Sequence, residues 1–167
     1  MDLYFRDNFF SSGMTEILNE QEHAVGQVDL KSAFGSAIDV YGPEGQLLCK
    51  GSFPFLSGKW EITDVNDERI GVLKGRFSLF TKKFTYETGT RGSYEILSPA
   101  FSKEYEVMDE SGARITRFEQ VNGWFSSGAF LLSNQGEVLD SYELVAVIMG
   151  MYAIQKRQQA AASNSTI

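Results

Sequence analysis

The sequence is poor in the residues on which disulfides, metal sites and most catalytic sites depend. Its single cysteine, Cys49, cannot form a disulfide within the chain, so nothing indicates an oxidising compartment. Because Cys49 lies in a predicted strand, we expect it to be a small buried apolar residue. The single histidine, His23, lies in the polar stretch "NEQEHAVG", where we expect a solvated turn residue.

Catalytic and phosphate-binding motifs are also missing. The sequence contains no G-x-S-x-G, no H-E-x-x-H, no G-x-x-x-x-G-K and no paired C-x-x-C. We therefore expect no catalytic residues, no bound metal and no cofactor. An enzyme stays an alternative, and it would need a pocket that holds carboxylates of perturbed pKa.

Positive charge is in short supply, with 15 Lys and Arg against 22 Asp and Glu and a net charge of -7. Nucleic acid requires a cationic face, so we expect no nucleic-acid partner. The N-terminal stretch "MDLYFRDNFF" has charges at Asp2, Arg6 and Asp7, so we do not expect it to act as a secretory signal. We expect a soluble cytoplasmic protein.

Segments rich in turn-forming residues recur at an even spacing. Their centres fall near residues 21, 44, 67, 90, 111 and 135, so neighbouring centres lie 21 to 24 residues apart. A turn with two flanking strands and a return connection fills a period of this length. The six segments read "NEQEH", "GPEGQ", "VNDE", "ETGTRG", "DESG" and "SNQGE". Six turns predict six hairpins, or twelve strands.

The segments between the turns alternate apolar and polar residues, as strands with one buried face do. In "SYEIL", Tyr94 and Ile96 alternate with Ser93 and Glu95, and "KEYEV", "KWEIT" and "KKFTYE" follow the same pattern. Helical spacing fits none of these four segments. The body of the protein is therefore predicted to be all-β.

An aromatic residue followed by serine and glycine precedes several hairpins. "FFSSG" at residues 9–13 recurs as "WFSSG" at residues 124–128, with looser copies in "FLSGKW" and "FSKEY". We interpret the motif as a recurrent corner, in which a buried phenylalanine and small residues permit a tight bend. A repeated ligand pocket is the alternative.

Near its end the chain changes to a helical pattern. Asp140 and Glu143 have the spacing of a capping box with Asp140 as N-cap, and Lys156 and Arg157 suit the negative end of a helix dipole. Residues 144–154 are uncharged and apolar all round, so such a helix is buried in a core or in lipid. The apolar run spans ~16 Å, about half the hydrocarbon thickness of a bilayer, and we therefore predict no transmembrane segment.

Twelve antiparallel strands close readily into a barrel, because closure removes exposed edges, and a barrel of this size leaves a lumen. The helix, predicted over about residues 142–156, would fill it, and Gly150 would let a large aromatic side chain of a strand approach its backbone. We thus predict an all-β fold, a closed ~12-stranded antiparallel barrel that encloses a hydrophobic C-terminal helix. It forms one domain over residues 1–157, followed by a disordered tail over residues 158–167. The helix residues expected in the core are Leu144, Val147, Ile148, Met151 and Ile154.

The hairpins followed by a hydrophobic C-terminal helix resemble the tubby-like superfamily, near its LURP-one-related group. The stretches "FSLFTKKFTYE", "SPAFSKEYEVMDE" and "SYELVAVIMGMYAIQKR" carry this resemblance, which extends over nearly the whole chain and rests on pattern. It implies a twelve-stranded barrel around a central helix. Because tubby domains bind phosphoinositide headgroups through basic residues on neighbouring strands, it also implies a surface for anionic lipid.

The basic residues are concentrated in one segment, since residues 74–91 contain five of them and one acidic residue. The candidate anion-binding residues are Lys74, Arg76, Lys82, Lys83 and Arg91. Lys74 and Arg76 share one face of a predicted strand, whereas Lys82 shares a face with Thr85 only if a bulge intervenes. A solvated strand face, whose charges offset nearby acids, is the alternative interpretation.

We expect a non-enzymatic binding or scaffold module of the tubby-like type, which recognises anionic lipid headgroups or phosphates through this basic strand face. Such a protein would be peripheral to the membrane. The second hypothesis is a protein-interaction module that uses exposed aromatic residues at the corners, such as Phe10 or Phe125. Most carboxylates fall in turns and on outward strand faces, where we expect them to be solvated.

Overall fold

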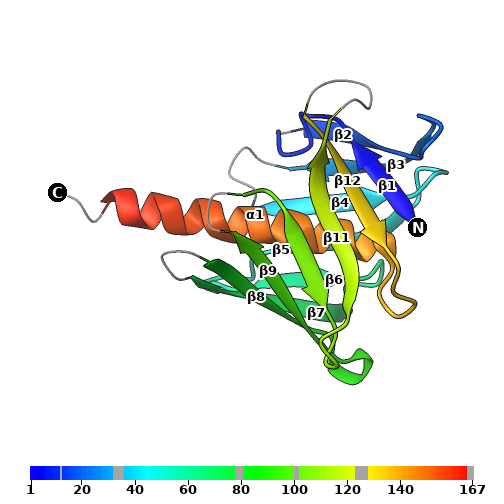
Figure 1. Cartoon of the computed structure of the whole chain (residues 1–167). Helices are drawn as coiled ribbons and strands as arrows, with labels where there is room; N and C mark the ends of the chain where they lie inside the picture. Colours follow the sequence, from blue (N-terminus) through cyan, green and yellow to red (C-terminus); the bar gives the residue numbers. More distant parts are fainter. Residues whose placement is uncertain (12, 32–35, 78–80, 100–101, 123–127, 165–167) are drawn as a thin grey trace.

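The computed structural model describes residues 1–11, 13–31, 36–77, 81–99, 102–122 and 128–164. They form twelve β-strands, one short 3-10 helix and one long C-terminal α-helix (Figure 1). The strands are β1 (Asp2–Phe5), β2 (Gly13–Leu18), β3 (Ala24–Leu30), β4 (Ala37–Tyr41), β5 (Leu47–Ser52), β6 (Trp60–Thr63), β7 (Arg69–Phe77), β8 (Thr81–Glu87), β9 (Ser93–Pro99), β10 (Tyr105–Met108), β11 (Arg114–Val121) and β12 (Ala129–Asn134). The 3-10 helix η1 spans Gly89–Arg91, and α1 spans Ser141–Asn164.

All twelve strands belong to one closed barrel. Each strand pairs antiparallel with its neighbours in the chain, and β1 pairs with β12 to close the circle. Buried residues alternate along the strands: in β9, Tyr94 and Ile96 are buried, whereas Glu95 and Leu97 are exposed. The helix α1 runs through the barrel and packs against β4, β5, β6 and β7 (Figure 1). The predicted fold is confirmed.

The sixth predicted turn differs from the other five, because residues 135–140 lead from β12 into α1 and not into another strand. The strand that pairs with β12 here is β1, over four residue pairs. The Met1 amino group donates a hydrogen bond to the Asn134 carbonyl oxygen at 2.5 Å, and the Asn134 amide donates to the Met1 carbonyl oxygen at 3.0 Å. The first and last strands therefore make the sixth pair, where the sequence predicted a sixth hairpin.

Four of the short turns share one geometry. In the first, the Asn19 amide donates to the His23 carbonyl oxygen and the Glu22 amide donates to the Asn19 carbonyl oxygen, each at 3.0 Å. The turns after β4, β6 and β10 repeat this pair of bonds. Their fourth residues have positive φ: Glu22 at 65°, Gly45 at 75°, Asp67 at 63° and Gly112 at 81°. His23 is exposed in its turn, as predicted.

The helix α1 begins as the sequence predicts. The Asp140 carboxylate accepts hydrogen bonds from the amides of Tyr142 and Glu143, at 2.8 and 3.4 Å, which makes Asp140 the N-cap. The five helix residues predicted for the core are at most 3% exposed: Leu144, Val147, Ile148, Met151 and Ile154. Among the described residues, no helix combines the length and apolarity required to cross a bilayer.

The predicted close approach at Gly150 is made by Trp60 of β6. A Cβ atom on Gly150 would overlap the Trp60 indole, and so would a Cβ atom on Gly51 of β5. Trp60 is completely buried between the two glycines, and within the described residues its Nε1 has no hydrogen-bond partner. Packing alone therefore sets the position of the ring, although an unsatisfied buried N–H is costly.

The helix α1 ends later than predicted, because it continues to Asn164, eight residues beyond the expected end near residue 156. Residues 158–164, predicted as part of a disordered tail, are helical and exposed, and they project from the barrel (Figure 1). Alanine has the highest helix propensity and glutamine a high one, which accounts for helix in "QQAAA". The remaining tail residues, 165–167, lie outside the described part of the chain.

The aromatic corners have different environments. Phe9 and Phe10 are buried, and Phe10 packs edge-on against Phe130 with ring centroids 5.4 Å apart. Phe10 is thus not the exposed aromatic that a protein-interaction site would need, because the chain turns it toward the core. Phe55, in contrast, is 93% exposed. Phe125 lies outside the described residues.

Candidate functional site

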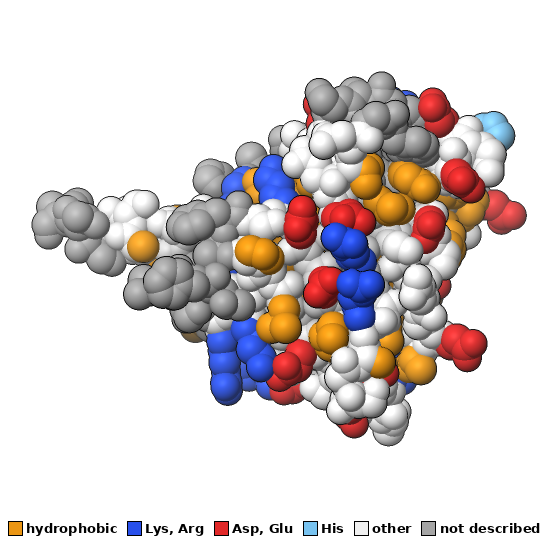
Figure 2. Space-filling model, in the orientation of Figure 1, with side chains coloured by type: hydrophobic (Ala, Val, Ile, Leu, Met, Phe, Trp, Pro, Cys, Tyr) orange, Lys and Arg blue, Asp and Glu red, His pale blue; other side chains and the backbone are white. Residues whose placement is uncertain are grey.

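The five basic candidate residues lie in three different places. Lys74 and Arg76 of β7 and Lys83 of β8 lie on the outward face of the sheet, because the residues next to them in the chain, Leu73 and Phe84, are buried in the core. Arg76 and Lys83 are directly opposite each other in the β7–β8 register. Figure 2 shows a group of Lys and Arg side chains over this part of the barrel, at the lower left. We call Lys74, Arg76 and Lys83 the β7–β8 basic face.

Two of these three cations have acidic partners. The Nζ atoms of Lys74 and Lys83 each lie 2.6 Å from a carboxylate oxygen, of Glu87 and of Glu95 respectively. All four side chains are well exposed, and exposed ion pairs contribute only about 0–1 kcal/mol, so a phosphate group can compete with these carboxylates. The Arg76 guanidinium is exposed and makes no ion pair or hydrogen bond with the part of the chain that the structure describes.

Lys82 points to the other side of the sheet, so the bulge needed to bring it onto the outward face is absent. It alternates with Lys83 and lies on the same side of β8 as the buried Phe84. Its Nζ donates a hydrogen bond to the Ser102 carbonyl oxygen at 2.9 Å. Partial burial lowers the pKa of the Lys82 ammonium group. Lys82 therefore helps to hold the connection between β9 and β10, apart from the β7–β8 basic face.

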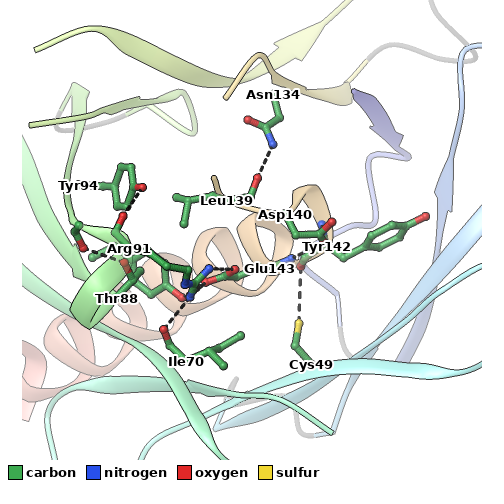
Figure 3. A network of polar contacts seen from close by, with 12 residues as sticks. Cys49, Ile70, Thr88, Arg91, Tyr94, Asn134, Leu139, Asp140, Tyr142 and Glu143 are labelled. Carbon is green, nitrogen blue, oxygen red and sulfur yellow. Dashed lines mark hydrogen bonds and ion pairs between the residues drawn. The ribbon is translucent and has the colours of Figure 1, made fainter. Parts of the chain in front are cut away.

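Arg91 lies near the opposite end of β8, at the end of the barrel where α1 begins, and its side chain is held there by α1 and the barrel wall (Figure 3). Its guanidinium donates to both carboxylate oxygens of Glu143, at 2.7 and 2.8 Å, and to the Ile70 carbonyl oxygen at 2.7 Å. The Tyr86 hydroxyl donates to the same Glu143 carboxylate at 2.5 Å. The Tyr94 hydroxyl donates to the Arg91 carbonyl oxygen at 2.8 Å. Arg91 thus fixes the first turn of α1 to the barrel wall.

This network is the feature that sequence reasoning missed. The expected capping box gives Glu143 the role of binding the N-cap backbone, whereas its carboxylate is buried at 5% exposure and paired with Arg91. A buried carboxylate needs a cation and further donors, because desolvation of an unpaired charge is costly. The sequence did contain one signal of this network, the acidic Glu143 at the start of an otherwise apolar helix. Its partner Arg91 lies 52 residues earlier, and nothing in the sequence around Arg91 indicates the pairing.

Two ionisable groups beside Glu143 are kept neutral. Burial, reinforced by the charges of Glu143 and Asp140, raises the pKa of the Cys49 thiol to about 12. Burial and the Glu143 charge also raise the pKa of the Tyr86 hydroxyl. The Cys49 thiol points at the Tyr142 carbonyl oxygen, with 3.7 Å between the sulfur and oxygen atoms (Figure 3). Cys49 is the buried small residue that the sequence predicts, and a neutral thiol is a poor nucleophile.

Two of the hollows on the barrel are lined partly by charged side chains. One, of 430 Å³, lies at the start of α1 and is lined in part by Cys49, Asp140 and Glu143. The other, of 480 Å³, lies where β9 and β10 diverge, and its lining mixes Glu104 and Arg117 with apolar side chains. No group of three or more His, Cys, Asp or Glu side chains in the described residues is arranged to hold a metal ion.

The fold is that of a closed twelve-stranded barrel with a helix running through it, the architecture that the tubby-like resemblance implied. An X-ray structure of the protein AT5G01750 from Arabidopsis thaliana is similar, with a TM-score of 0.62 and 12% sequence identity. The match covers 92% of this chain and 90% of that one. At this identity the similarity shows a shared fold. No protein-family model and no curated protein matches the chain.

Proposed function

We propose that this chain is a non-enzymatic binding module of the tubby-like type, which binds anionic phospholipid headgroups through the β7–β8 basic face. The observation that carries the proposal is the direct pairing of Arg76 with Lys83 across two strands, with the Arg76 guanidinium exposed and without a protein partner in the described residues. A planar guanidinium beside an ammonium group suits a phosphate, which accepts several hydrogen bonds at once.

Magnitudes support this choice over a purely structural role for these residues. Each Lys or Arg close to an anionic membrane contributes about 1 kcal/mol of binding free energy. The ion pairs of Lys74 and Lys83 with Glu87 and Glu95 are exposed and contribute about 0–1 kcal/mol each. Exchanging a carboxylate for a lipid phosphate at these lysines is therefore close to neutral, and Arg76, which has no partner among the described residues, adds a net gain.

The test is charge reversal on the β7–β8 basic face. We expect the double variant Arg76→Glu, Lys83→Glu to lose most of its binding to phosphatidylcholine vesicles that contain an equal amount of phosphatidylserine, measured by co-sedimentation. The matched control is Arg114→Glu, Arg117→Glu on the outward side of β11, which changes the net charge equally and should retain more binding. Equal loss in both variants, or no binding by the unmodified protein, would exclude this site.

A further inference from the structure

Charged side chains are sorted along the axis of α1. At the end of the barrel where α1 begins, six connections form what we call the acidic rim: residues 19–23, 42–46, 64–68, 88–92, 109–113 and 135–140. These connections carry ten acidic side chains and a single Lys or Arg, Arg91, which is paired with Glu143. Acidic side chains are visible around this end of the molecule, at the right of Figure 2.

The opposite end, from which α1 emerges, has the reverse charge, and we call it the exit rim. In the described residues, this rim comprises the connections after β1, β3, β5, β9 and β11, the last two residues of the strand before and the first three of the strand after each connection, the same residues of β7 and β8, and the emerging part of α1. It carries nine basic and six acidic side chains. The basic ones are Arg6, Lys31, Lys59, Arg76, Lys82, Lys83, Lys103, Lys156 and Arg157, and the acidic ones are Asp7, Asp29, Asp39, Glu61, Glu104 and Glu106. A net charge of -7 therefore conceals a cationic end.

The exit rim also presents an apolar turn to solvent. Phe55 and Leu56 are 93% and 92% exposed, more than the other exposed large hydrophobic side chains of the described residues. They are the two central residues of a turn closed by a hydrogen bond from the Ser57 amide to the Pro54 carbonyl oxygen at 3.0 Å. Leu56 has a φ of 57°, in the left-handed region.

Phe55 and Leu56 bury almost no surface within the barrel. The second central position of a turn with positive φ favours glycine or asparagine, because a branched side chain is strained there. Exposing Phe55 and Leu56 also forgoes the gain that burial of large apolar side chains gives elsewhere in the barrel. Strain and exposure at one tip indicate that these side chains act outside the fold.

The turn is held in place beside the cations. The Arg157 guanidinium of α1 stacks on the Phe53 ring at 3.7 Å and donates to the Ser57 carbonyl oxygen at 2.9 Å. On the other side of the turn, β6 starts at Trp60, which is opposite Leu73, one residue before the β7–β8 basic face. Helix residues 158–164 also emerge at this end. They carry no charged side chain, so no charge on them would have to lose its water where this end meets an apolar surface.

We propose that the exit rim docks on an anionic lipid bilayer, with Phe55 and Leu56 inserted at the level of the headgroups and the acidic rim directed away. This inference rests on the proposed function and adds how the protein is oriented and anchored. Cations at the surface attract the exit rim, and the bilayer repels the acidic rim, so the charge asymmetry orients the molecule. Aromatic and aliphatic side chains at the interface then add apolar burial, the usual partner of a polybasic patch.

The test replaces the apolar turn without changing charge. Phe55→Ser with Leu56→Asn should fold normally, because both side chains are exposed and asparagine tolerates the φ of residue 56. We expect this variant to bind vesicles of equal phosphatidylcholine and phosphatidylserine at least about tenfold more weakly than the unmodified protein. The matched control is Val65→Ser with Val138→Ser, which removes two exposed valines, 52% and 56% exposed, from the acidic rim and should bind normally.

A second measurement reports insertion directly. A Phe55→Cys variant labelled with a polarity-sensitive fluorophore should shift its emission to the blue on these vesicles, whereas Val65→Cys should not. The native Cys49 is buried and stays unlabelled. If the Phe55 and Leu56 variant binds like the unmodified protein while Arg76→Glu, Lys83→Glu does not, insertion is wrong and the proposed headgroup site stands. If the unmodified protein ignores these vesicles, or binds pure phosphatidylcholine equally well, the proposed function itself fails.

Discussion

Two residues of α1, Gly150 and Glu143, can be explained only together with the residue of the barrel that each one contacts. Gly150 lies in the interior of α1, where glycine costs about 1 kcal/mol relative to alanine. The Trp60 ring occupies the space that a Cβ atom would take, which offsets this cost. The sequence already marks Gly150 as unusual in an apolar helix. It cannot identify Trp60 as the partner, because that depends on how α1 lies within the barrel. The same holds for Glu143, whose partner Arg91 the sequence placed in a surface site.

At this scale we predict that Gly150→Ala destabilises the protein, although alanine is the better helix former. Overlap with the Trp60 indole should lower the free energy of unfolding by about 1–3 kcal/mol, as overpacking does in other cores. In a Trp60→Phe background, the smaller ring makes room and the cost of Gly150→Ala should shrink. Urea unfolding of the two single variants and the double variant measures this coupling. A Gly150→Ala protein more stable than the original would contradict the close contact.

The elements differ in how far the sequence predicts them. Turns were predictable because Asn19, Asp64 and Asp109 each start a turn with a side-chain oxygen that accepts amide hydrogens of the third and fifth residues. The β1–β12 pair was not, since strands at opposite ends of the chain carry no local signal of their pairing. The end of α1 was misjudged because small and polar residues suit both a tail and an exposed helix.

For α1 we predict that two C-terminal deletions of different length change the melting temperature by different amounts. Deleting residues 158–167 should leave the melting temperature nearly unchanged, because residues 158–164 are exposed and bury little surface. Deleting from Ile154 onward also removes a buried core residue and the Arg157 contacts to the turn at Ser57, and it should lower the melting temperature by several degrees. Scanning calorimetry compares the two. Equal melting temperatures for both deletions would show that the last turns of α1 do not stabilise the barrel.

For the whole molecule, the fold follows from the sequence more closely than the surface does. Period-2 alternation and the apolar helix led to the closed barrel because both patterns report burial, which is a property of the core. The β7–β8 basic face could be recognised only in the structure, where Lys82 points to the other side of β8 and Arg91 lies in η1, apart from Lys74, Arg76 and Lys83. The two oppositely charged rims became visible only once alternate connections were assigned to opposite ends of the barrel.

Global stability should fall in alkali, and Cys49 should contribute to this fall. The Cys49 thiol ionises near pH 9 when exposed in the unfolded chain, and its pKa is about 12 in the folded protein. Its contribution is complete below about pH 9 and is lost as the pH rises toward 12, because unfolding then releases a proton. Between about pH 9 and pH 10 we expect the contribution of Cys49 to the free energy of unfolding to fall by about 1 kcal/mol.

The measurement is urea unfolding at several pH values in this window, with Cys49→Ala as the control. The variant lacks the buried thiol, so between about pH 9 and pH 10 its free energy of unfolding should fall less steeply than that of the original protein. The fall that remains in the variant comes from tyrosines whose pKa burial raises, such as Tyr86 and Tyr105. Parallel pH profiles for the variant and the original protein would show that Cys49 is not the group responsible.

The closing pair of strands also determines when folding can finish. A ribosome makes β12 only after the eleven other strands, so the edge of β1 that pairs with β12 stays unpaired while they are made. The helix that fills the lumen follows all twelve strands, so apolar strand faces have no core to bury until it is made. Folding of the barrel is therefore expected to be completed only after α1 has emerged from the ribosome. Until then the open sheet is a target for chaperones and a risk for edge-to-edge aggregation.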